Sequence, residues 1–122
     1  HEQPGRWAGR FAFSQDGSRV FVGSGGGLLT QLDTKTGQEL KRFVGHSYYV
    51  LSIAIAPNEK QIVSGDKLGR LIVWDVASQQ ALVTLVDHGS PLQSVDWSPD
   101  GRRIVAGKED GTVQIWTLPR WP

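Results

Sequence analysis

The side chains best suited to bind a metal ion or transfer a proton are two histidines, His46 and His88, and one carboxylate, Asp96. A zinc site or an acid–base pair needs several such groups at short, regular spacing. The two histidines are far apart in the sequence, and neither has a second histidine or carboxylate at ligand spacing. Asp96 is either paired inside the fold or a lone acid facing a ligand. We therefore predict no catalytic residue, no metal site and no cofactor.

The run from Gly23 to Gly27 has the composition of a phosphate-binding loop. Such a loop continues into a Lys-Ser or Lys-Thr pair and a helix, because the lysine and the helix N-terminus hold the phosphates. Neither feature follows Gly27. The run is therefore predicted to be a hairpin turn between two strands.

Composition argues against several classes of partner. Lysine and arginine number 13 against 12 aspartates and glutamates, so charge favours neither nucleic acid nor an anionic membrane as a partner. No apolar run approaches the roughly 20 residues that span a bilayer, and the N-terminal residues lack the pattern of a signal peptide. The chain has no cysteine, which excludes disulfides and thiol chemistry and leaves the compartment open, with the cytoplasm favoured.

These residues are embedded in a pattern that recurs three times at a constant interval, without a gap. In this register glycines coincide at 23, 65 and 107 and again at 27, 69 and 111, and Leu32 coincides with Trp74 and Trp116. Short apolar segments separated by glycine turns, with a period in the low forties, are typical of β-propeller arrays. One such repeat cannot bury its own faces. The pattern predicts an all-β fold of antiparallel, four-stranded blades.

Eleven strands are expected from the pattern. Their predicted ranges are 11–14, 51–56 and 92–97 for the first strands, 19–22, 61–64 and 103–106 for the second, 28–32, 71–74 and 113–116 for the third, and 39–44 and 81–86 for the fourth. The third blade therefore lacks its fourth strand.

A family resemblance is carried by four dipeptides in the same register: Gly45-His46, Trp74-Asp75, Asp87-His88 and Trp116-Thr117. The spacing from histidine to tryptophan is the same in both repeats. The chain resembles the WD-repeat family of β-propellers over nearly its whole length. The resemblance implies a single partial propeller, residues 1–122, with blades at about 7–44, 46–86 and 88–118. The first repeat departs from the pattern, with Pro4 and Leu32 where the histidine and tryptophan are expected.

The resemblance also implies a hydrogen-bonded tetrad of histidine, serine or threonine, aspartate and tryptophan inside each blade. The second repeat supplies His46, Ser64 and Trp74, with Leu68 at the aspartate position. The third supplies His88, Asp110 and Trp116, with Ala106 at the hydroxyl position.

Partner binding in the family takes place on the loops that enter the first strands and on those between the second and third strands. The positions carried over to this chain are Trp7, Tyr48, Tyr49, Lys67, Pro91 and Glu109. Exposed aromatic residues there favour binding, because they add contact area at a small loss of rotamer entropy. The alternative is that they pack on a neighbouring blade.

Three blades leave two broad faces uncovered, since a closed propeller has about four to eight blades. We expect further blades to cover them, either from the same gene, with this chain as its C-terminal part, or from copies of the chain, as a dimer of six blades or a trimer of nine. The implied function is a non-enzymatic scaffold for a protein or peptide partner, without nucleic acid or membrane. The alternative is an accessory or sensor propeller of a larger enzyme or signalling protein.

Overall fold

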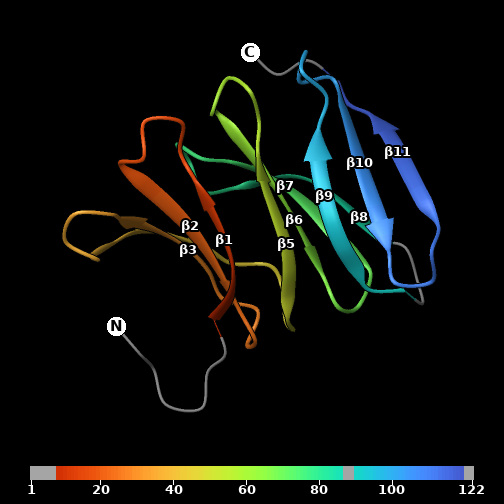
Figure 1. The fold of residues 1–122 in the computed structure, drawn as a ribbon, viewed down its shortest axis with the longest axis horizontal. Coiled ribbons are helices and arrows are strands. Elements are labelled where there is room, and N and C mark those ends of the chain that lie inside the picture. The colour runs from red at the N-terminus through yellow and green to blue at the C-terminus, as the bar shows by residue number, and fades with distance from the viewer. Residues whose placement is uncertain (1–7, 87–89, 120–122) are drawn as a thin grey trace.

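The computed structural model describes residues 8–86 and 90–119, which form eleven β-strands in three antiparallel sheets (Figure 1). The strand orders are β1-β2-β3-β4, β5-β6-β7-β8 and β11-β10-β9, and we call these sheets blade 1, blade 2 and blade 3. The strands are β1 Ala8–Phe13, β2 Arg19–Ser24, β3 Leu29–Asp33, β4 Glu39–Phe43, β5 Val50–Ile55, β6 Gln61–Asp66, β7 Arg70–Asp75, β8 Ala81–Val86, β9 Leu92–Trp97, β10 Arg103–Lys108 and β11 Val113–Thr117. The prediction of propeller blades, the last with three strands, is confirmed.

Glycines in the left-handed region make the turns between the second and third strands. Gly27, Gly69 and Gly111 have φ angles of 82°, 85° and 90°. At Gly27 a Cβ atom would also lie 2.6 Å from the carbonyl oxygen of His46. Any other residue there would be strained by the positive φ angle, and its side chain would push away the loop that enters blade 2. The glycine-rich run is thus a hairpin turn, as predicted.

Two apolar cores hold the three blades together. In Figure 1 the first strands of the three blades, β1, β5 and β9, follow one another across the molecule, and β5 contacts both of the others. Between blades 1 and 2, the ring centroids of Phe43 and Trp74 lie 5.6 Å apart in an edge-on arrangement, and both residues are buried. The core between blades 2 and 3 includes Val73, Leu92 and Trp97. Blade 2 is therefore covered on both faces, and every residue of β6 is buried.

Close approach between blades depends on a glycine in each second strand. A Cβ on Gly23 would lie 2.7 Å from Cγ1 of Val50, and one on Gly65 would lie 2.8 Å from Cβ of Leu92. Ser52, beside Gly65, donates a hydrogen bond across the interface to the carbonyl oxygen of Leu92 at 2.9 Å. The first strand of each following blade thus lies directly on this glycine.

The outer faces of blades 1 and 3 are not covered within the described residues. Phe11 and Phe13 on β1 are 60% and 65% exposed, and Val113 and Ile115 on β11 are 67% and 63% exposed. These residues alternate along their strands, so each pair points to one face of its sheet. Both end blades therefore present an apolar face to solvent.

Candidate protein-interaction face

Blade 2 contains a continuous hydrogen-bonded chain of four buried side chains. The indole Nε1 of Trp74 donates to Oγ of Ser64 at 2.8 Å, and Oγ of Ser64 lies 2.6 Å from Nε2 of His46. The other ring nitrogen, Nδ1 of His46, lies 2.7 Å from Oδ2 of Asp66. With a neutral imidazole, the Ser64 hydroxyl donates to Nε2 and Nδ1 donates to the carboxylate, so every polar group is satisfied.

The acid of this tetrad is Asp66, which the sequence analysis missed. The predicted register placed Leu68 at the aspartate position, and Leu68 is exposed. The second strand runs two residues further than predicted, to Asp66, so that Ser64 and Asp66 point to the same face of β6. An aspartate two residues after the serine was the signal that could have revealed it.

Asp66 also shapes the turn between β6 and β7. Its Oδ1 accepts hydrogen bonds from the backbone N–H groups of Leu68 and Arg70, both at 2.9 Å. Burial acts to raise the pKa of Asp66, but hydrogen bonds from His46 and these two N–H groups outweigh burial and lower it. The ionised carboxylate therefore links the tetrad to the turn between β6 and β7.

The described residues of blade 3 form no such tetrad. Ala106 and Lys108 stand in the register positions of Ser64 and Asp66. Asp110 is exposed, and its Oδ1 accepts from the backbone N–H and the hydroxyl of Thr112 at 2.9 and 2.6 Å, which lowers the pKa of Asp110. Trp116 is half-buried against the core between blades 2 and 3, and His88 lies outside the described residues.

We call the end of the blades that carries the turns between second and third strands, together with the segments leading into the first strands, the loop face. On blade 2 the rings of Tyr48 and Tyr49 stack with centroids 4.6 Å apart. The ammonium of Lys67 lies 5.9 and 5.2 Å from these two centroids, within the range of cation–π attraction. The backbone N–H of Lys67 donates to the carbonyl of Tyr49 at 2.9 Å, which fixes the loops against each other.

Blade 3 repeats this backbone link with different side chains. The N–H of Glu109 donates to the carbonyl of Pro91 at 3.0 Å. Pro91 is half-buried and Glu109 is exposed. Of the predicted binding residues, the structure thus brings Tyr48, Tyr49 and Lys67 into one cluster and places Pro91 with Glu109 on the next blade. Trp7 lies outside the described residues.

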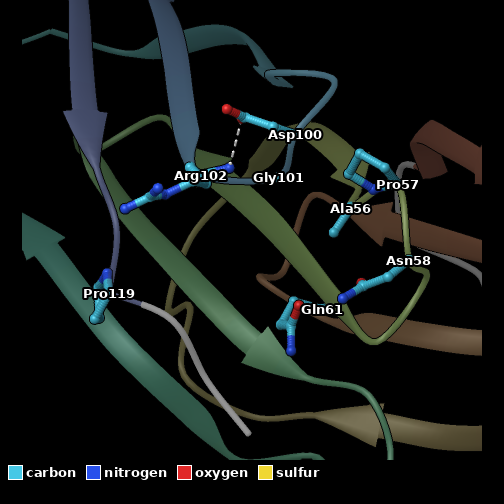
Figure 2. A pocket seen from close by; sticks show the side chains of 8 residues that line it. All are labelled: Ala56, Pro57, Asn58, Gln61, Asp100, Gly101, Arg102 and Pro119. Atoms are coloured by element: carbon cyan, nitrogen blue, oxygen red, sulfur yellow. Dashed lines mark hydrogen bonds between the residues drawn. The ribbon is translucent and has the colours of Figure 1, made fainter.

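A cavity of about 460 Å³ opens at the opposite end of the blades, between the turns that follow β5 and β9 (Figure 2). Its lining includes Asn58, Gln61, Asp100 and Arg102. The carboxylate of Asp100 accepts hydrogen bonds from Ser98 and from the backbone of Arg102, and the amide oxygen of Asn58 accepts one from the backbone of Lys60. These polar groups therefore stabilise the two turns.

Within residues 8–86 and 90–119, no group of three or more histidine, cysteine, aspartate or glutamate side chains could hold a metal ion. None of the described residues belongs to a helix long and apolar enough to cross a membrane.

Comparisons with known proteins identify the repeats. Residues 37–75 and 79–117 match the family described as WD domain, G-beta repeat. A solved structure titled "Crystal Structure of Mitotic Checkpoint Complex" contains a chain with 28% identity and a TM-score of 0.86, over 96% of this chain and 36% of that one. No curated protein matches. The present chain thus spans about a third of the length of that solved chain. The two matched stretches and the shared blade architecture show that the chain belongs to the WD-repeat family of β-propeller proteins.

Proposed function

We propose that this chain is a non-enzymatic scaffold that binds a protein or peptide through the loop face of blade 2. The observation that carries the proposal is the cluster of Tyr48, Tyr49 and Lys67, which lies on the loop that enters blade 2 and on the turn between β6 and β7, and is open to solvent on Tyr48 and Lys67. Loops positioned by a rigid scaffold often carry binding residues. Tyrosine is also enriched among residues that dominate interface energies.

The charges around the cluster favour an acidic partner. Lys67 is exposed, and the guanidinium of Arg70 is anchored by a 3.0 Å hydrogen bond to the carbonyl of Gly45. The nearby carboxylate of Asp66 is buried and bonded to His46. The surface therefore combines the exposed cation of Lys67 and the partly exposed cation of Arg70 with aromatic rings and the apolar side chain of Leu68, which is 52% exposed. A peptide with a carboxylate next to an apolar side chain matches both properties.

A displayed random-peptide library tests this proposal. The library is selected on the wild-type chain and counter-selected on Tyr48→Ser/Tyr49→Ser. We expect enriched peptides to carry Asp or Glu beside an apolar residue, and to bind the Tyr48→Ser/Tyr49→Ser variant at least about 30-fold more weakly, as for an interface hot spot.

The control is Val44→Ser, which removes an 81% exposed apolar residue just before the loop that enters blade 2. This variant should retain the selected peptides. Selected peptides that bind the double tyrosine variant as well as the wild type would contradict the proposal. So would a loss of binding that accompanies a large drop in the melting temperature of the double variant, because the tyrosines would then act in folding.

A further inference from the structure

Blade 3 carries, on its uncovered face, the same docking site that blade 2 uses to hold its neighbour. In blade 2 this site consists of Gly65 with Ser52 beside it, and a Cβ on Gly65 would lie 2.8 Å from Oγ of Ser52. In blade 3, Gly107 and Ser94 stand at the same positions of the repeat, and the corresponding distance is 2.7 Å. The serine hydroxyl therefore lies equally close to the glycine in both pairs.

The difference between the two sites is their occupancy. Over Gly65 lies Leu92 of the next blade, which also accepts the hydrogen bond from Ser52. Over Gly107, nothing except Ser94 comes within 4 Å of the missing Cβ among the atoms that the structure describes. The exposed residues Val113 and Ile115 stand in register with Leu71 and Val73, which are fully buried against blade 3. Blade 3 thus has an open glycine and an apolar face at the place where the first strand of another blade would pack.

Blade 1 presents the complementary surface of the same chain. Phe13 on β1 is in register with Trp97, which is buried in the core between blades 2 and 3 and donates from its indole Nε1 to the carbonyl of Ala54 at 3.1 Å. Phe13 itself is 65% exposed. Residue 8, at the start of β1, is in register with Val50 and Leu92, the residues that lie over Gly23 and Gly65. One chain therefore carries both halves of a blade-to-blade interface.

We propose that two copies of this chain associate head to tail, with β1 of each copy seated on Gly107 and Ser94 of the other. Such a contact is heterologous, and it closes when the rotation between copies completes a ring. Three blades from each copy make six, which lies within the range of about four to eight blades that close a propeller. Both apolar end faces are then covered. The proposal is independent of the binding function proposed for the loop face.

Solution mass of the 122-residue chain, measured by light scattering after size exclusion, is the first test. We expect a discrete dimer. Ser94→Ala/Gly107→Val fills the docking site while removing the clash of the new side chain with the Ser94 hydroxyl. Phe13→Asp places a charge on the outer face of blade 1, which docks on this site in the other copy. Each variant should raise the dimer dissociation constant by at least about 30-fold, the threshold for a hot spot.

Control variants separate docking from folding. Ser94→Ala alone removes only the hydrogen bond that Ser94, like Ser52, would donate to the docked strand, and should weaken the dimer much less than Ser94→Ala/Gly107→Val. Val44→Asp makes the same type of change as Phe13→Asp at another exposed apolar residue and should leave the dimer intact. Circular dichroism of each monomeric variant should retain the β-sheet spectrum, because all the changed residues lie on the surface of a single chain.

Mixing the two damaged variants gives the decisive result. A pair formed from Phe13→Asp and Ser94→Ala/Gly107→Val contains one doubly damaged interface and one intact interface. We expect the mixture to form dimers at concentrations where each variant alone is monomeric. A monomeric or polydisperse wild-type chain, a dimer insensitive to both variants, or a mixture that stays monomeric would each overturn the proposal.

Discussion

Blades 2 and 3 share one repeat pattern but differ in what stabilises them. In blade 2 both faces are covered, β6 is buried throughout, and Trp74, Ser64, His46 and Asp66 form a satisfied buried network. In blade 3 one face is open, and the hydroxyl and acid positions hold Ala106 and Lys108. Strand patterning is thus sufficient to form a blade. The tetrad adds a rigid polar link from the core to the loop face, and only the blade with this link carries the stacked tyrosines.

The largest expected difference between the blades is in their tryptophans. Trp74→Ala should lower the free energy of unfolding by about 3–5 kcal/mol, because it leaves a cavity and removes the indole N–H that donates to Oγ of Ser64. Trp116→Ala should have less than half of that effect, because Trp116 is half-buried. Urea unfolding followed by circular dichroism measures both. Equal losses for the two variants would mean that the blades are equally dependent on their tryptophans.

The two aspartates give the next largest contrast. Asp66→Ala removes the acceptor of His46 and of two backbone N–H groups, so we expect a loss of about 2–4 kcal/mol. Asp110→Ala removes only exposed turn contacts with Thr112 and should change stability far less. The same urea titrations compare them. If Asp110→Ala proved as destabilising as Asp66→Ala, the importance assigned to the buried tetrad would be wrong.

Acid should weaken blade 2 through Asp66. Because the pKa of Asp66 is lower in the folded chain, its ionised form contributes stability that is present above the ordinary carboxyl pKa of about 4 and is lost as pH falls through the folded value. Asp66→Asn removes this contribution. The difference in unfolding free energy between wild type and Asp66→Asn should therefore shrink as pH falls from 7 toward about 3. A difference that stays constant over this range would contradict the ionised state.

The smallest effects on stability are expected on the loop face. Lys67→Ala and Glu109→Ala change exposed residues at corresponding positions of blades 2 and 3, so each should alter the unfolding free energy by no more than about 0.5 kcal/mol. Peptides selected on the wild type should bind Lys67→Ala more weakly and Glu109→Ala unchanged. Titration of one labelled peptide against the wild type and the two variants measures the three dissociation constants. A larger loss of affinity in Glu109→Ala than in Lys67→Ala would place the binding site on blade 3.

Much of the fold could be predicted because the repeat is regular in sequence. Glycine turns and apolar strands recur at the same positions of each repeat, so the positions of the strands and the three-stranded third blade could be predicted from the repeat. The acid of the tetrad could not be found by strict register, because Asp66 reaches His46 from a strand position rather than from the turn. The ammonium of Lys67 contacts both tyrosine rings from a different loop. The spacing of residues in the sequence does not predict how side chains of two loops are placed relative to each other.

Hydrogen exchange of the tryptophan indole protons, followed by NMR, tests whether a buried tetrad in blade 2 supports the loop face. Exchange reports how often each buried hydrogen bond opens. We predict that the Nε1 proton of Trp74 exchanges at least about tenfold more slowly than that of Trp116, and that Asp66→Asn speeds the exchange of Trp74 while leaving Trp116 unchanged. Equal exchange rates in the wild-type chain, or a Trp74 rate that does not respond to Asp66→Asn, would show that the tetrad does not support the loop face.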